Sequence, residues 1–446
     1  MKRRIWGILT FLIIFFGITS CDVPVTVQEA EPLNMEQQAG IDSAELLFRL
    51  FRPKCENGVL SSGALYEICV PRPWNRELVV YAPGYRDPNL DLRIRDDEIG
   101  GFSVQEIMNN LGYAFATTSY HKNGLSLPEA LEDVTELVEL TDKFTRPPLR
   151  NAYLTGPSFG GLVTVLGIEQ YANTFSAALG ACGPYGDFAW QLKYLGDFRV
   201  VFDHLFVDEI VEWPVWTMPG TVDADFIAQW GVFEPAIRAA ILADWNAGGE
   251  KVKQLLRITG APVDLSDPQT TVETSVETVV DVLWYHVHGT NDAMEIMEGQ
   301  PYHNIGQNFD NLDVKRFTAN VSVKDHYQTS GSLQRPLVTL HTHLDPVIPI
   351  QHLAFYNGKV NPKTLHTPIP VLRYGHCNFT IEEVMAAFAL MIFKSTNQDL
   401  LVSTSVFPEP VQQQSFLTIA RELGAYPKIV TPLELKKTME PYERVK

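Results

Sequence analysis

Short apolar runs alternate with helical patterns along two separated parts of this chain. Runs of strand character, most of them bounded by Gly or Pro, lie at 77–84, 113–120, 151–157, 175–183, 336–345 and 367–376. Segments with helical spacing lie between them, at 102–112, 127–144, 159–172, 351–360 and 380–394. Strands separated by helices of this length form right-handed crossovers. The sequence therefore predicts an α/β fold, with a mostly parallel sheet and helices on both of its faces.

The alternation stops between residues 186 and 335, which we call the insertion. This stretch is irregular and partly helical, and it holds six of the eight tryptophans of the chain: Trp190, Trp213, Trp216, Trp230, Trp245 and Trp284. We expect a largely helical insertion at the strand ends, with most tryptophans in its own core and one or two near the functional site. Residues 397–446 form an appendage for which the sequence offers no placement.

The first twenty residues have the pattern of an export signal. A basic start at Lys2–Arg4 precedes the apolar run 5–18, which is too short to span a bilayer as an ordinary helix. The run ends in "ITSC", which resembles the lipobox of bacterial lipoproteins. The resemblance implies that residues 1–20 are removed and that Cys21 carries lipid, which would anchor the protein in the bacterial cell envelope. A plain secretory signal followed by a chance cysteine is the alternative.

Residues 21–45 are polar and acidic, without a helical apolar stripe, and read as a tether. The whole chain carries a formal net charge of −18. Because nucleic-acid phosphates would be repelled, this charge argues against a nucleic-acid partner. The membrane, reached through the lipid on Cys21, is the expected macromolecular partner.

A serine lies between two glycines in the stretch "YLTGPSFGGLV", which runs from Tyr153 to Val163. Gly-x-Ser-x-Gly alone is weak evidence, since a chance match arises in about one chain in ten of this length. Here, however, a strand pattern precedes Ser158 and a helical pattern follows it. That is the placement of a nucleophile elbow, in which a sharp bend exposes the hydroxyl and leaves no room for side chains two residues away. The first turn of the helix also presents N–H groups that favour developing negative charge.

A serine hydroxyl needs a base to remove its proton, and the base needs a carboxylate to orient it. Asp345 follows the strand at 336–345, and His376 follows the strand at 367–376. Both stand at strand ends, in the order serine, acid, histidine along the chain. We therefore expect Ser158, Asp345 and His376 to form a catalytic triad.

These segments resemble the α/β-hydrolase superfamily, and within it a branch of secreted bacterial lipoproteins with a large lid insertion. The matching pieces are "GPSFGG", "HTHLDPVIP" and "YGHCNFT". The resemblance implies two halves of one catalytic domain, 46–185 and 336–396, around a lid at 186–335. It also implies an oxyanion hole made by the backbone N–H groups of Phe159 and Tyr85. The chain has Pro83-Gly84 where the family usually has His-Gly, and Pro83 has no N–H to donate.

Four cysteines other than Cys21 remain, and an exported protein can oxidise them. Cys55 and Cys69 flank a plausible hairpin, so a disulfide between them is reasonable. Cys182 and Cys377 follow strands that would end at the same edge of the sheet, so a bridge there would stiffen the histidine loop. Four cysteines allow three pairings, and two buried thiols remain an alternative for the second pair.

The predicted activity is that of a serine hydrolase, most favourably on carboxylic esters through an acyl-enzyme. The substrate would be a small molecule or a peptide, because an exopeptidase could use the same triad. A non-catalytic binding protein on a hydrolase scaffold is the third hypothesis. His341, His343 and Asp345 would point to one side of a strand and suggest metal ligands. No helical His-Glu-x-x-His motif accompanies them, and we expect neither metal nor cofactor.

Overall fold

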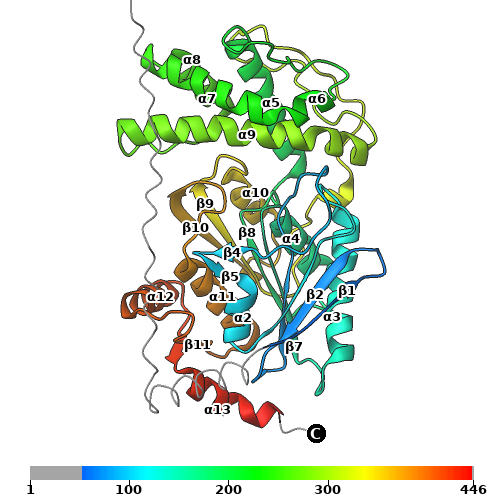
Figure 1. Cartoon of the computed structure of the whole chain (residues 1–446), viewed down its shortest axis with the longest axis vertical. Coiled ribbons are helices and arrows are strands. Elements are labelled where there is room, and N and C mark those ends of the chain that lie inside the picture. Colours follow the sequence, from blue (N-terminus) through cyan, green and yellow to red (C-terminus); the bar gives the residue numbers. More distant parts are fainter. Residues whose placement is uncertain (1–52, 444–446) are drawn as a thin grey trace, which may run out of the picture. The chain divides into compact units, whose positions relative to one another are not determined.

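The computed structural model describes residues 53–443, including the side chains up to residue 439. The predicted signal peptide, the site of lipidation at Cys21 and the tether at 21–45 lie outside the described residues. The described part is built on an eight-stranded sheet with the strand order β1-β2-β6-β3-β7-β8-β9-β10 (Figure 1). Its strands are β1 (Lys54–Val59), β2 (Leu65–Val70), β3 (Glu77–Tyr81), β6 (Ala114–Thr118), β7 (Asn151–Pro157), β8 (Ala177–Ala181), β9 (Leu337–Leu344) and β10 (His366–Tyr374).

Within this sheet the six strands β6, β3, β7, β8, β9 and β10 are parallel to one another. The antiparallel pairs of the sheet are β1 with β2 and β2 with β6. Helices connect the parallel strands and cover both faces of the sheet. One face carries α3 (Leu127–Phe144), α4 (Phe159–Gln170) and α10 (Gln351–Lys359); the other carries α2 (Val104–Asn110) and α11 (Ile381–Thr396). The predicted α/β class, with a mostly parallel sheet and helices on both of its faces, is thereby confirmed.

Strand β3 shows why the central strands are apolar throughout. Leu78 and Val80 belong to the core under α3 and α4, whereas Val79 and Tyr81 belong to the core under α2 and α11. Successive side chains of a strand point to opposite faces, and here each face is covered by helices. A continuous apolar run in the sequence is therefore the expected signature of such a strand.

The residues after α11 extend the second of these cores. They form β11 (Leu401–Ser403), α12 (Pro410–Glu422), β12 (Lys428–Val430) and α13 (Pro432–Glu443), and β11 pairs with β12 in a small parallel sheet. Phe407 and Phe416 are fully buried in the same core as α11. The described residues of the C-terminal appendage, which the sequence left without a place, thus cover the outer side of α11.

The insertion is largely helical and has a core of its own. It contains α5 (Phe188–Phe206), α6 (Ala224–Ala228), α7 (Trp230–Asn246), α8 (Glu250–Thr259) and α9 (Pro268–Met297). Trp213, Trp216 and Trp230 are buried in this core, and the other three tryptophans of the insertion pack against the protein with partial exposure. Most of the tryptophans therefore have a packing role, as expected. Helix α9 crosses above the sheet, on the side where β9 and β10 end (Figure 1).

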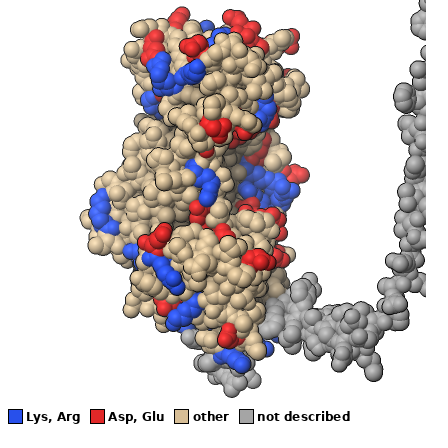
Figure 2. All heavy atoms as spheres, turned by 90° about the vertical axis from the view of Figure 1, so that its left-hand side faces the viewer, with Lys and Arg blue, Asp and Glu red and all other residues tan. Residues whose placement is uncertain are grey.

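Charged side chains are interspersed on the face of the molecule drawn in Figure 2, with acidic and basic groups side by side and broad uncharged areas between them. Within residues 53–443, no helix combines the length and the apolar character that would let it cross a membrane.

Candidate active site

Ser158 occupies a strained turn between β7 and α4. Its backbone has φ 56° and ψ −124°, a conformation that residues with side chains rarely adopt. The Ser158 N–H donates to the carbonyl oxygen of Ala181 at 2.9 Å, which ties the turn to the end of β8. A Cβ atom placed on Gly156 or Gly160 would lie 2.4 Å or 2.0 Å from the carbonyl oxygen of Ala82. Both glycines are needed because the end of β3 passes directly beside the turn.

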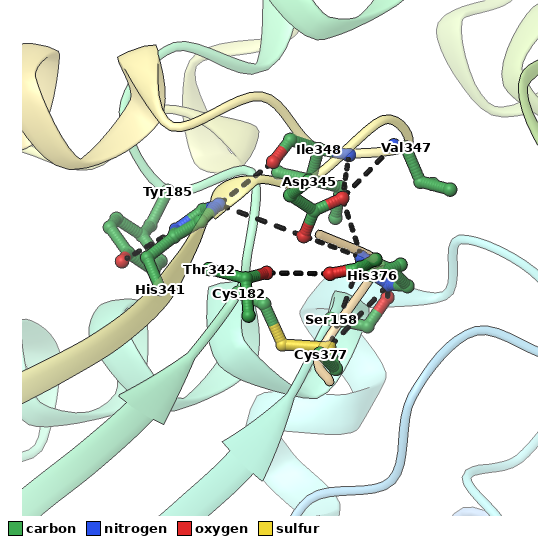
Figure 3. Close-up of a disulfide and its surroundings, with 11 residues drawn as sticks. Ser158, Cys182, Tyr185, His341, Thr342, Asp345, Val347, Ile348, His376 and Cys377 are labelled. Carbon is green, nitrogen blue, oxygen red and sulfur yellow. Dashed lines mark hydrogen bonds and ion pairs between the residues drawn. A yellow bond between two sulfur atoms is a disulfide. The ribbon is translucent and has the colours of Figure 1, made fainter. Parts of the chain in front are cut away.

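The imidazole of His376 links Ser158 to Asp345. Its Nε2 lies 2.9 Å from the Ser158 Oγ, and its Nδ1 lies 2.8 Å from the Asp345 Oδ2 (Figure 3). The three residues follow β7, β9 and β10, which are parallel strands that end at one edge of the sheet. The structure therefore brings together the three side chains that the sequence proposed as a triad.

Asp345 is wholly buried, and backbone groups hold its carboxylate. Its Oδ1 accepts hydrogen bonds from the N–H groups of Val347 and Ile348, both at 2.9 Å. These two bonds leave Oδ2 directed at His376, as Figure 3 shows. The carboxylate can thus fix the tautomer of the imidazole, with the proton on Nδ1 and the lone pair of Nε2 facing the serine.

His341 supports the acid loop and is not part of a metal site. Its Nε2 donates to the Ile348 carbonyl at 2.7 Å, and its Nδ1 lies 3.3 Å from the Tyr185 hydroxyl. Burial lowers the pKa of His341, so the ring is neutral beside Asp345. His343 is exposed, whereas His341 and Asp345 are buried. The alternative in which these three side chains ligate a metal from one side of a strand is not supported.

Both cysteine pairs form disulfides. Cys55 and Cys69 face each other in the β1–β2 hairpin and are bonded. Cys182 and Cys377 are also bonded, and this bridge joins the end of β8 to the residue after His376 (Figure 3). One ring nitrogen of His376 and the two sulfurs lie within 4.8 Å of one another, but sulfurs bonded to each other offer no thiolate to a metal.

The two proposed oxyanion donors lie beside Ser158. Phe159 is the first residue of α4, so its N–H has no acceptor within the helix. A Cβ atom on Gly84 would lie 3.5 Å from the Ser158 Cβ, and Tyr85 lines the same pocket as Ser158. The phenolic hydroxyl of Tyr85 donates to the His288 carbonyl at 3.1 Å, which ties this loop to α9.

A pocket extends from Ser158 between the sheet and the insertion. It has an empty volume of about 800 Å³, including the part open to solvent, and its lining is almost wholly apolar. Phe188, Trp216 and Met294 contribute from the insertion, while Phe159 contributes from the start of α4 and Ile348 from the loop after β9. One tryptophan, Trp216, therefore lines the space next to the serine. A lining of this apolar character fits an apolar organic group.

Helix α9 brings further polar groups to the site that the sequence reading missed. The Tyr285 ring centroid lies 6.1 Å from that of His376. Burial raises the pKa of Asp281 to about 6, with the charge of Glu277 adding to this and that of His376 opposing it. His286 also lines the pocket; burial lowers its pKa well below the usual value, and neither ring nitrogen has a hydrogen-bond partner among the described residues. No local motif marks these residues, because only the packing of α9 over the strand ends brings them here.

Comparison with known proteins yields remote structural likenesses only. No protein-family model matches the chain, and no curated protein matches it. An esterase from Aspergillus oryzae shares 14% identity and a TM-score of 0.41, over 71% of each chain. An acylaminoacyl peptidase from Pyrococcus horikoshii shares 11% identity and a TM-score of 0.37, over 74% of this chain and 39% of the other.

Brefeldin A esterase, a bacterial homologue of human hormone-sensitive lipase, shares 9% identity and a TM-score of 0.38, over 86% of this chain and 84% of its own. Likenesses at this level transfer no activity to this chain. The function has to be argued from the arrangement of Ser158, His376 and Asp345.

Proposed function

We propose that the protein is a serine hydrolase that cleaves carboxylic esters through an acyl-enzyme intermediate. The observation that carries this proposal is the unbroken contact from the Ser158 hydroxyl through the His376 imidazole to the buried Asp345 carboxylate, at 2.9 Å and 2.8 Å. A hydroxyl, a base and an orienting carboxylate in this geometry are what nucleophilic catalysis requires.

In the first step His376 takes the proton of Ser158 as the oxygen attacks the ester carbonyl. The negative charge that develops on the carbonyl oxygen would be stabilised by the N–H groups of Phe159 and Tyr85, near the N-terminus of α4. His376 then protonates the departing alcohol, and the acyl group stays on Ser158. A water molecule, deprotonated by His376, releases the acid and restores the serine.

The pocket supports a small-molecule ester with an apolar acyl or alcohol group as the substrate. Its lining offers aromatic and aliphatic surface from Phe188, Trp216 and Ile348, the first two of which belong to the insertion. A panel of short-chain and aromatic esters, compared with aminoacyl anilides, tests this choice. Preferential cleavage of the anilides would replace the ester proposal with that of an exopeptidase.

The two disulfides suggest an exported protein, because such bonds persist in oxidising compartments. We propose further that the enzyme is a lipoprotein of the bacterial cell envelope, held at a membrane by a lipid on Cys21 and linked to it by the acidic tether. Metabolic labelling with a radioactive fatty acid should mark the wild type and not a Cys21→Ala variant. Labelling of both the wild type and Cys21→Ala, or of neither protein, would refute the lipid anchor.

A fluorophosphonate probe tests the nucleophile directly. The folded wild type should be labelled covalently, and Ser158→Ala should lose both the labelling and ester hydrolysis by a factor of about 10⁴ or more. Ser332→Ala serves as the matched control, because Ser332 is exposed and does not line the pocket that contains Ser158. If the folded wild type is not labelled and cleaves no ester, the enzymatic proposal fails and the binding-protein hypothesis takes its place.

A further inference from the structure

A second, smaller pocket lies against the turn Pro83–Gly84 and gathers three arginines. Arg86, Arg93 and Arg95 all line it, together with neutral polar residues such as Ser119 and Asn123. No Asp or Glu is among the described residues that line it. This is unusual in a chain with a net charge of −18.

The three guanidinium groups are only partly neutralised by the protein. Arg95 pairs with Asp97 at 2.7 Å and donates to the carbonyl oxygen of Gly84 at 3.3 Å. Neither Arg86 nor Arg93 forms an ion pair within 4 Å with any carboxylate of residues 53–443; Asp91 acts on Arg86 only as a weaker, more distant charge. Because arginine stays protonated at every ordinary pH, the positive charges of Arg86 and Arg93 remain without a paired carboxylate in the described part of the chain, next to the paired Arg95.

Arg86 shows the consequence of this crowding. Its Nη1 is buried and has no hydrogen-bond acceptor among the described residues. Desolvation lowers the pKa of Arg86, and repulsion from Arg93 and Arg95 lowers it further. A buried guanidinium N–H without an acceptor is costly, and the cost disappears when an anion accepts from it.

We propose that this pocket binds an oxyanion, a carboxylate or phosphate group, between Arg86 and Arg93. Planar guanidinium groups match such oxygens with paired N–H donors, and the Nη1 of Arg86 is a donor that still lacks an acceptor among the described residues. The same turn contacts the catalytic serine on its other side, because a Cβ atom on Gly84 would lie 3.5 Å from the Ser158 Cβ. The anion is either a free ion or an acidic group of the substrate; only the second case rests on the proposed function.

Binding is measured first, without catalysis, by calorimetric titration of the folded protein with inorganic phosphate and with acetate at low salt. The wild type should show saturable binding of at least one anion, and Arg93→Gln should weaken it about tenfold or more. Arg421→Gln removes one charge from the exposed end of α12 and should bind as the wild type does. The proposal fails if the wild type shows no saturable binding of either anion, or if Arg93→Gln binds as tightly as Arg421→Gln.

The anion-free proteins supply an independent readout. If Arg93 serves to bind an anion, its replacement removes the repulsion between Arg93 and Arg86. Arg93→Gln should then melt at the same temperature as the wild type or higher. A purely structural arginine would give a lower melting temperature. A clear destabilisation of anion-free Arg93→Gln, with unchanged phosphate and acetate binding, would overturn the proposal.

The source of the anion is decided with pairs of esters that differ only in a terminal carboxylate or its neutral amide. If the substrate supplies the group, Arg93→Gln raises KM for the acidic ester about tenfold and leaves the neutral ester unchanged. If phosphate binds while both esters behave alike, the site takes a free ion. If phosphate binds but no ester is cleaved, the anion site stands and the proposed function falls.

Discussion

At the scale of single residues, steric crowding at the turn explains the glycines on either side of Ser158. The carbonyl oxygen of Ala82 lies so close to the turn that neither Gly156 nor Gly160 can carry a methyl group without displacing backbone. Ser158 itself is held at positive φ, so the conformation depends on neighbours that leave room for it. The glycines of the motif therefore follow from backbone crowding, and the turn that they allow presents the Ser158 hydroxyl to His376.

A Gly160→Ala variant should therefore lose activity without touching the substrate. We expect a fall in kcat/KM of at least about 100-fold and a loss of stability of about 1–3 kcal/mol, because the added methyl group would lie 2.0 Å from the Ala82 oxygen. Ester hydrolysis and chemical denaturation measure the two effects.

Gly231→Ala is the control for Gly160→Ala. Gly231 lies at a comparable position near the start of a helix, α7, but a Cβ atom there would meet no atom within 4 Å. Alanine should leave activity intact and stabilise the helix by up to about 1 kcal/mol. Equal activity of the two variants would contradict the steric account of the turn.

At the scale of elements, the loop that carries His376 is braced from two sides. The Cys182–Cys377 disulfide joins it to the end of β8, and the Thr342 hydroxyl of β9 donates to the Gly375 carbonyl at 2.7 Å (Figure 3). One brace comes from β9, which pairs with β10, and the other comes from the end of β8, on the far side of β9. The histidine is therefore positioned by the sheet edge as a whole.

Removing the disulfide with Cys182→Ala/Cys377→Ala should lower kcat more than it changes KM, because the base is less well placed while the pocket remains. The bridge spans 195 residues, so the chain-entropy model gives a loss of stability of up to about 5 kcal/mol. Steady-state kinetics on a short ester and denaturant titration check both values.

The other disulfide offers a matched comparison. Cys55→Ala/Cys69→Ala opens a bridge of 14 residues in a hairpin remote from His376, with an expected loss of about 3 kcal/mol and an unchanged kcat. If the two double variants lose kcat to the same extent, the bridge at Cys377 has no special role in placing the base.

At the scale of the whole molecule, buried histidines couple stability to pH. Burial lowers the pKa values of His286, His341, His352 and His366, the last of them to about 4. In the unfolded chain these groups have pKa values near 6.5 and bind protons first as the pH falls. Their contribution to stability is therefore complete above about pH 6.5 and is lost as the pH falls toward 4.

His366→Gln should make stability less sensitive to acid. From the pKa of about 4 for His366, the wild type should lose about 2 kcal/mol between pH 7 and pH 5 through this residue alone. Denaturant titrations at the two pH values measure the difference. Asp133 and Asp281, whose pKa values burial raises to about 6, act in the opposite sense, so the variant must be compared with the wild type. If the wild type and His366→Gln lose the same stability between pH 7 and pH 5, the lowered pKa of His366 is contradicted.

Local sequence signals determined much of this protein. The helix at 127–144 and the strand at 151–157 have the predicted bounds, because apolar periodicity and Gly or Pro punctuation are properties of neighbouring residues. The order of Ser158, Asp345 and His376 could likewise be read, since each follows a recognisable strand. The sequence also predicts that these three residues meet, because parallel strands end at the same edge of a sheet.

Tertiary structure decided what depends on residues far apart in the chain. The apolar pocket, the placement of Asp281 and His286 by α9, the crowding of Arg86, Arg93 and Arg95, and the docking of the C-terminal residues on α11 have no local signature. The physical reason is that periodicity reveals which face of an element is buried, whereas only packing reveals which other element covers that face.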